Sequence, residues 1–316
     1  GFDSVPQPTY KDKDLRKAVA LEKAKAQDET EVFANDSKKK IYMHWMYDVP
    51  MGEQLDDDGD SLESIEGCLT DAQYNRDEHR KAVIDDILDN WVSQSHNGKF
   101  HAILATSSIP EAIKYYKLFA QRDCGLKTTA VFDPSDGNNE SSIEKIDGIA
   151  QMLEDYNSLF GTCFNISGYA SFKRDVCARL AHKTPYTAVE NEPSKCLDIL
   201  IVVDQMLTGY DSKWLNTLYM DKFYKWSNIE MIIQAFSRTN RVFNDDKPHG
   251  IIRYYRRPYT MKNIIEYAFE QYSGQKPYGI FVAKLIQNLE NMNAAFSDIN
   301  DIFKIAGIPD FFKTSR

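Results

Sequence analysis

Short apolar runs alternate with amphipathic stretches through the middle of the chain. The run at 197–203, Leu-Asp-Ile-Leu-Ile-Val-Val, is nearly all apolar, as strands buried on both faces are. Four other runs have the length and composition of strands, at 100–106, 127–132, 215–220 and 250–255. Because helical stretches lie between most of these runs, the pattern predicts a parallel sheet in an α/β layer domain.

Residues 228–241, between the last two runs, have the periodicity of one amphipathic helix. Its apolar side is made of Ile229, Ile232, Ile233 and Phe236. The opposite side carries Gln234, Arg238 and Arg241. A guanidinium suits bidentate contact with phosphate because its donors form a planar fork and its charge is permanent. On this stretch alone a surface helix with solvated arginines is the more frequent outcome, since amphipathic helices are common.

Composition limits the classes of protein that the chain can belong to. It has 316 residues, 42% hydrophobic and 27% charged, which is ordinary for a soluble globular chain of one large or two smaller domains. No apolar run is long enough to span a membrane. The five cysteines form no Cys-x-x-Cys pair, so we expect neither a zinc site nor a disulfide framework, and a cytoplasmic location. The start at Gly1 has no signal peptide and no Met, which indicates a processed chain or a fragment.

Charge is distributed unevenly along the chain. The net charge of −9 argues against a uniformly basic nucleic-acid binder. Residues 51–90 contain thirteen Asp and Glu against three Lys and Arg, and the glycine-punctuated part at 51–67 is expected to be a mobile loop. Residues 204–262 contain ten Lys and Arg against six Asp and Glu, so this segment is the one whose local field would attract an anionic partner.

Polar residues follow two of the expected strands. In open parallel sheets ligands bind beyond the carboxyl ends of the strands. Thr106 and Ser107 follow the first run, and their hydroxyls suit phosphodiester oxygens. Thr208, Gly209 and Asp211 follow the run at 197–203. Gly209 could permit close approach of a ligand to the backbone and Asp211 could bind a ribose or metal, although a turn glycine and a helix-capping aspartate explain them equally well.

Three stretches resemble the sequence motifs of a known group of motor proteins. They read ILIVVDQMLTGYD at 199–211, LNTLYMDK at 215–222 and QAFSRTNRV at 234–242. These are similar to motifs V and VI of superfamily 2 helicase-type motors and, more narrowly, to the R (restriction and translocation) subunit of type I restriction enzymes. Residues 100–117, with Ala-Thr-Ser-Ser-Ile at 105–109, resemble the motif IV region of the same family. The resemblance covers about residues 100 to 258.

The resemblance implies an architecture and an activity. The fold would be a RecA-like parallel sheet flanked by helices, with a helical N-terminal lead-in and a helical C-terminal extension. Residues 1–98 would lead into the second RecA-like domain at 99–258, and 259–316 would begin a helical C-terminal domain. The activity would be ATP-dependent translocation on double-stranded DNA, with ATP and Mg shared with a first RecA-like domain of the same subunit. Methyltransferase and specificity subunits would complete the complex.

The resemblance also assigns roles to eight residues of this sequence. Arg241 would be the arginine finger toward the γ-phosphate, with Arg238 supporting it at the catalytic site. Three residues would lie at the nucleotide: Gln234, Gly209 and Asp211. Three would meet the DNA backbone: Thr106, Ser107 and Thr208.

The sequence departs from the family pattern in ways that limit the expected activity. It has no Gly-x-x-x-x-Gly-Lys-Ser/Thr phosphate-binding loop, no Asp-Glu-x-His motif for magnesium and no convincing nuclease pattern. We therefore expect this chain to be inactive as an ATPase when alone and to bind no metal by itself.

Two alternatives stay open. The chain could be a non-catalytic module that docks DNA through 204–262, mainly with Arg256 and Arg257, or an α/β enzyme of another kind, for which no catalytic base is evident. The basic and aromatic residues at 253–257 fit a nucleic-acid surface, but they fit the rim of an edge strand somewhat better.

Overall fold

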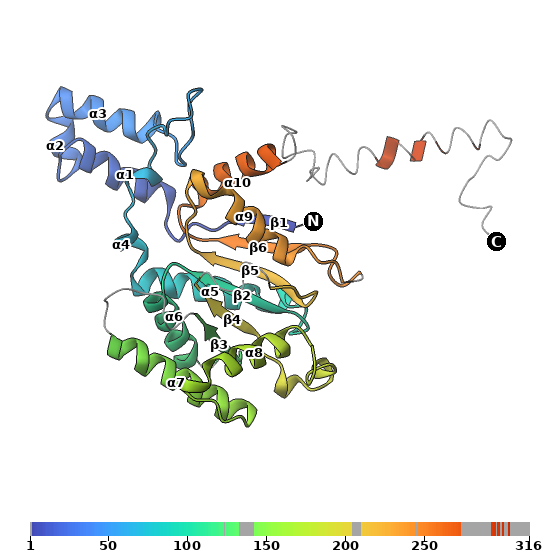
Figure 1. Ribbon diagram of the computed structural model, residues 1–316. Helices are drawn as coiled ribbons and strands as arrows, with labels where there is room; N and C mark the ends of the chain where they lie inside the picture. Colours follow the sequence, from blue (N-terminus) through green and yellow to red (C-terminus); the bar gives the residue numbers. More distant parts are fainter. Residues whose placement is uncertain are drawn as a thin grey trace. The chain divides into compact units, whose positions relative to one another are not determined.

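The computed structural model describes residues 2–122, 124–132, 142–203, 210–243 and 245–272, with a few more at 292–294, 296, 297, 299 and 303. The chain divides into two compact units, Gly1–Ile265 and Glu266–Arg316. The fold of the first unit is what positions the functional residues (Figure 1). The division into domains at 98 and 258 stays a prediction.

The first unit is built on one six-stranded sheet whose strand pairs are all parallel. Its order is β1-β6-β5-β2-β4-β3. The strands are β1 (Phe2–Pro6), β2 (His101–Thr106), β3 (Thr128–Val131), β4 (Ile199–Val202), β5 (Leu215–Asp221) and β6 (Gly250–Tyr254). Every residue of β2, β4 and β5 is buried, as near-continuous apolar runs require when helices cover both faces. The predicted RecA-like α/β fold is confirmed.

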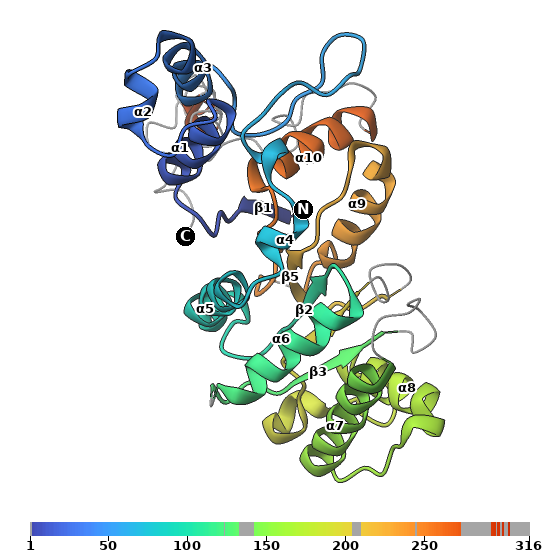
Figure 2. The same cartoon turned by 90° about the vertical axis from the view of Figure 1, so that its left-hand side faces the viewer.

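Helices cover the two faces of this sheet. The larger ones are α5 (Asp77–Gln94), α6 (Ile109–Gln121), α7 (Ser142–Phe160), α8 (Tyr169–Leu180) and α9 (Ile229–Phe236). Right-handed crossovers between parallel strands place α5 and α6 on one face, and α8 and α9 on the other. The contacts of β5 agree, because Tyr219 donates to Gln94 of α5 at 2.7 Å and Tyr115 of α6 donates to Asp221 at 2.9 Å. Figure 2 shows α5 and α6 in front of the strands.

The helical lead-in differs in detail from the prediction. Residues 14–33, which are rich in Ala, Lys and Glu, predict a single helix, but the structure has α1 (Asp12–Lys23) and α2 (Glu29–Phe33), followed by α3 (Asp36–Tyr47). The break lies at Lys25, whose φ is 51°, and the Asp28 side chain caps the new helix by accepting from the amide of Glu31. The three helices share a small core that includes Val32 and Tyr42.

Pro6 and Pro8 predict a linker before α1, and for Pro6 this is wrong. Residues Phe2–Pro6 form β1, which pairs in parallel with β6 in a register that matches Phe2 to Gly250. The acidic stretch at 51–67 was expected to be a mobile loop. The structure has a turn within this stretch, in which Asp56 accepts hydrogen bonds from the amides of Asp58 and Asp60, and the mobility of the stretch stays a prediction.

The remaining elements are short, apart from one helix. They are η1 (Glu66–Cys68), α4 (Asp71–Tyr74), η2 (Ile166–Gly168), η3 (Val189–Asn191), η4 (Pro193–Lys195), η5 (Trp226–Asn228), η6 (Ser237–Thr239) and α10 (Pro258–Tyr272). The sequence at 280–296 also predicts a helix, but this range lies mostly outside the described residues.

Candidate functional site

The helix that was expected to carry both arginines is shorter than predicted. α9 buries Ile232, Ala235 and Phe236, leaves Gln234 exposed, and ends at Phe236. Arg238 lies in the 3-10 turn η6 and Arg241 lies beyond it. The prediction that one helix face presents Gln234, Arg238 and Arg241 together is therefore wrong.

Packing of η6 against the sheet explains the early end of α9. Thr239 is fully buried, and its hydroxyl donates to the carbonyl of Phe236 at 3.1 Å. A β-carbon on Gly250, the first residue of β6, would overlap the side chain of Thr239. Only glycine allows this close approach, so the chain turns tightly onto the start of β6 instead of continuing as a helix.

Both arginines contact the same short segment, which lies between β4 and β5. The Arg238 guanidinium donates to the carbonyl of Gln234 at 3.0 Å and to the carbonyl of Tyr210 at 3.2 Å. The Arg241 guanidinium forms an ion pair with the carboxylate of Asp211. That pair is well exposed, with 61% of the Arg241 side chain and 49% of the Asp211 side chain open to solvent. The structure thus brings together four of the predicted site residues: Gln234, Arg238, Asp211 and Arg241.

Tyr210 fixes this segment to the sheet. Its hydroxyl and Nε2 of His101 are hydrogen-bonded at 3.1 Å, and both side chains are buried. Burial raises the pKa of the Tyr210 hydroxyl and lowers the pKa of His101 well below its usual value, so both groups are neutral near pH 7. His101 is the first residue of β2. The segment at 210–211 therefore approaches the amino end of β2, and it does not lie at the carboxyl edge of the sheet, where it was expected.

The two described residues among those predicted to contact DNA differ in their exposure to solvent. Thr106 ends β2 and is fully buried, and its hydroxyl donates to the carbonyl of Val202 at 3.1 Å. Ser107 is exposed. Thr208, together with Gly209 of the nucleotide set, lies outside the described residues. Whether any of these residues contacts DNA stays a prediction.

The matched region of the sequence identifies the family. A sequence model of the family described as type I restriction enzyme subunit R domain 3 matches residues 98–257, which is half of the chain. The chain belongs to this family. The match includes β2 to β6, and with them the residues that hold Arg238 and Arg241.

Individual relatives agree with this R-subunit assignment. A type I restriction enzyme endonuclease subunit of Staphylococcus saprophyticus is 32% identical over 213 residues, which cover 65% of this chain and 22% of the relative. One of Staphylococcus aureus is 31% identical over 200 residues, covering 61% and 20%. The HindI endonuclease subunit of Haemophilus influenzae is 42% identical over 60 residues, covering 19% and 5%. The chain spans about a fifth of the length of the first two relatives.

One solved structure gives a weaker likeness. The crystal structure of the C-terminal part of the Fun30 ATPase domain matches with a TM-score of 0.31 and 12% identity, over 79% of this chain and 63% of that one. The likeness is too small for its sites to be compared with those of the R-subunit domain.

The carboxyl edge of the sheet in this R-subunit domain holds a buried network of charges that the sequence analysis missed. Asp221, the last residue of β5, lies beside Thr106 and is fully buried. It is bound by His79 at 2.7 Å, by Tyr115 at 2.9 Å and by two nitrogens of Arg256 at 2.9 and 3.1 Å. Burial opposes ionisation of Asp221, but the contacts with His79 and Arg256 prevail and lower its pKa to about 2. The carboxylate is therefore charged at neutral pH.

Other basic residues of the 253–257 stretch are also used inside the fold. Arg253 donates to both carboxylate oxygens of Asp86 at 2.9 and 2.6 Å, and Tyr255 donates to Asp86 at 2.8 Å. Arg256 is only 2% exposed. The interpretation of this stretch as the rim of an edge strand was wrong, because β6 lies between β1 and β5 and these side chains are buried. Arg256 is not available to a DNA backbone at the surface, which weakens the alternative of a docking module that depends on it.

Across the described ranges of the chain, no group of three or more His, Cys, Asp or Glu side chains could hold a metal ion. Within the same part of the chain, no helix is both long enough and apolar enough to cross a membrane.

Proposed function

We propose that this chain is the second motor domain of an ATP-dependent DNA translocase, the R subunit of a type I restriction enzyme, and that Arg241 is its arginine finger. One observation carries the proposal: the Arg241 guanidinium lies at the surface in an exposed ion pair with Asp211. Exposed pairs of this kind contribute only about 0 to 1 kcal/mol, so Arg241 can exchange Asp211 for another anion.

The residues at this position fit a polyphosphate. Arg238 and Arg241 are permanently charged, and both are anchored on residues 210–211. ATP would supply the bond to be cleaved and Mg would balance part of its charge, while a first RecA-like domain would supply the phosphate-binding loop. Arg241 would leave Asp211 and stabilise the charge that develops on the transferred phosphoryl group. Arg238, whose donors hold the carbonyls of Gln234 and Tyr210, would keep the segment in place.

The DNA contacts of the motor belong to the same proposal. Ser107 is exposed directly after β2, and its hydroxyl would meet a phosphate of double-stranded DNA. Thr106, whose hydroxyl donates to the carbonyl of Val202, would position Ser107, and Thr208 would contact the same DNA backbone. The methyltransferase and specificity subunits of the complex would then choose where the motor acts.

The test is ATP hydrolysis by the R subunit that contains this domain. Arg241→Ala should lower kcat by about 10³-fold or more, the size expected when an arginine finger is removed. Arg122→Ala is the matched control, because Arg122 also forms a partly exposed ion pair with an aspartate, Asp85 of α5. Its kcat should equal that of the unmodified subunit. Normal hydrolysis by the Arg241→Ala subunit would exclude the assignment.

A further inference from the structure

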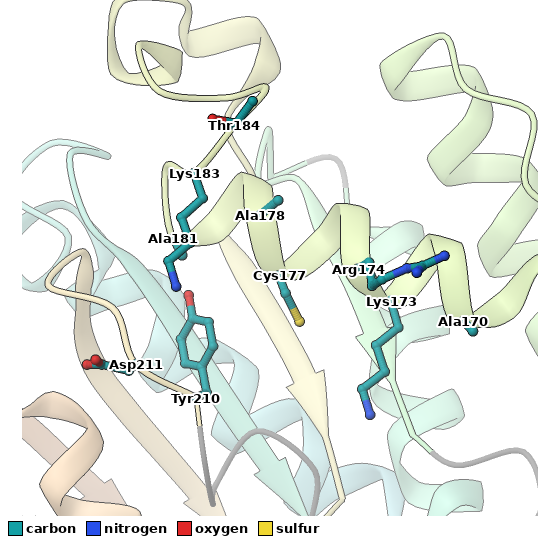
Figure 3. Close-up of a pocket in the computed structure, with 10 residues that line it drawn as sticks. All are labelled: Ala170, Lys173, Arg174, Cys177, Ala178, Ala181, Lys183, Thr184, Tyr210 and Asp211. Atoms are coloured by element: carbon teal, nitrogen blue, oxygen red, sulfur yellow. The ribbon is translucent and has the colours of Figure 1, made fainter.

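A groove runs along the side of α8 that faces Tyr210 and Asp211 (Figure 3). Its volume is about 850 Å³. In Figure 3 the side chains of Lys173, Cys177 and Lys183 extend from α8 and the turn after it toward the side on which Tyr210 and Asp211 lie. We call this feature the α8 groove. None of the roles assigned so far uses it, except that Asp211 lines it.

The lining of the α8 groove is basic, although the whole chain is acidic. Among the described residues of the lining, Lys173, Arg174 and Lys183 stand against one carboxylate, that of Asp211. That carboxylate is itself compensated by its ion pair with Arg241. A local excess of positive charge inside a hollow concentrates anions there, whatever the net charge of the molecule. The groove therefore fits an anionic partner.

The dimensions of the α8 groove favour an extended anion over a single phosphate. Its lining runs from Ala170 to Ala181, which corresponds to about 16 Å of helix at 1.5 Å per residue. One strand of DNA advances 3.4 Å along the axis per nucleotide, so this length corresponds to about five nucleotides. The alanines of the lining have short side chains, so the backbone of a nucleic acid can lie close to the helix and to the flanking lysines.

We propose that the α8 groove binds the phosphodiester backbone of double-stranded DNA, and that Asp211 makes the strength of this binding depend on the position of Arg241. The proposal rests on the proposed motor function and adds to it a second contact surface and its regulation. Lys173, Arg174 and Lys183 supply the attraction, and Asp211 supplies an adjustable repulsion.

The coupling follows because Asp211 belongs both to the ion pair with Arg241 and to the lining of the α8 groove. While Arg241 is paired with it, the carboxylate adds little negative charge to the groove. When Arg241 turns to a nucleotide phosphate, the carboxylate is left uncompensated beside the DNA backbone and repels it. The domain then grips DNA more tightly without nucleotide than with it. By linkage, DNA in the groove also favours the Arg241–Asp211 pair.

The first test measures binding of a fluorescent DNA duplex to the 316-residue chain by anisotropy, from about 50 to 200 mM salt. Lys173→Ala/Arg174→Ala/Lys183→Ala should weaken binding at least about tenfold at the lowest salt. The slope of log K against log salt should fall in magnitude by about 2 to 3, since each lost phosphate contact removes about 0.9. The matched control is Lys40→Ala/Lys81→Ala/Lys117→Ala, which removes the same charge from exposed positions on α3, α5 and α6. It should bind almost as the unmodified chain does.

Three results would overturn the proposal that the α8 groove binds DNA. The unmodified chain could fail to bind the duplex at low salt, or the two triple variants could lose the same affinity. Polyglutamate could also displace the duplex as well as unlabelled DNA does, which would indicate an acidic protein segment as the partner. Thermal unfolding of both triple variants checks that they remain folded.

The second test is a double-mutant cycle on the same DNA-binding measurement. Arg241→Ala should weaken DNA binding about two- to fivefold, because it leaves Asp211 uncompensated. Asp211→Asn should bind DNA at least as tightly as the unmodified chain, and adding Arg241→Ala to it should change nothing further. An equal loss from Arg241→Ala in both backgrounds would exclude the coupling. This readout needs no ATP, so it can succeed or fail independently of the hydrolysis test for the arginine finger.

Discussion

Two of the arginine–aspartate pairs in the domain differ in almost every respect except composition. Arg256 and Asp221 are 2% and 0% exposed, and their two hydrogen bonds are joined by those from His79 and Tyr115. Arg241 and Asp211 are 61% and 49% exposed and meet through the Nε and Oδ1 atoms. The comparison shows that burial and the number of partners decide whether an arginine is a fixed part of the fold or is available to a ligand.

Desolvation explains the difference. A charge that has been removed from water is strongly destabilising unless every one of its partners is present, so a buried pair cannot be opened for a ligand. An exposed pair has lost little hydration and gains little from the contact, so a polyphosphate can compete with it. The buried pair holds the carboxyl ends of β5 and β6 together, and the exposed pair leaves Arg241 at the surface, where the proposed nucleotide would bind.

The largest contrast is expected on removal of the two aspartates. Asp221→Ala should lower the free energy of unfolding by about 3 to 5 kcal/mol, because it leaves Arg256 buried without its counter-charge. Asp211→Ala should lower it by less than about 1 kcal/mol. Urea unfolding at pH 7 measures both. Similar losses for the two variants would mean that burial does not separate the pairs.

A smaller effect is expected on acidification. Because the folded-state pKa of Asp221 is lowered to about 2, below the value of about 3.9 in an unfolded chain, its contribution is complete above about pH 4 and is lost as pH falls toward 2. The total corresponds to about 2 to 3 kcal/mol, of which about 1 is lost by pH 3. The unmodified chain should therefore lose more stability than Asp221→Asn between pH 5 and pH 3. Parallel pH curves of urea unfolding would contradict this.

The smallest expected effect is that of the Arg241→Ala substitution on the stability of the chain. Arg241→Ala should change the free energy of unfolding by less than about 1 kcal/mol, although it should abolish hydrolysis in the R subunit. Arg256→Ala, its counterpart in the buried pair, should cost several kcal/mol because Asp221 is then left uncompensated. If Arg241→Ala destabilises the chain as much as Arg256→Ala does, its effect on ATPase activity would have to be attributed to unfolding.

The sheet could largely be predicted from the sequence, because a buried strand is a local pattern. The run at 197–203 needs no knowledge of its neighbours to be recognised as β4. β1 could not be recognised in the same way, because an edge strand such as Phe2–Pro6 with Asp3 and Ser4 lacks an apolar run. What makes it a strand is its pairing with β6, which is distant in the sequence.

The site was predictable only in part, for similar reasons. The resemblance to motifs V and VI grouped Arg238, Arg241 and Asp211, and the structure brings them together. Arg241 does not share a helix face with Gln234, because Thr239 packs closely against Gly250 and the helix ends before Arg241. The burial of Arg256 also depends on a partner, Asp221, whose proximity no local pattern contains. The α8 groove was missed because Lys183 comes from a turn and Asp211 from another segment.

The pairing of β1 with β6 determines when, during synthesis, the sheet can be completed. The partner of Phe2 is Gly250, made about 250 residues later. At a synthesis rate of about 5 to 20 residues per second, the first strand waits roughly 10 to 50 s before its edge of the sheet exists. During that time Phe2–Pro6 has no backbone partner in β6, and the central strands β2, β4 and β5 can pair without it. β1, which is synthesised before the other five strands, is thus among the last parts of the sheet to be fixed.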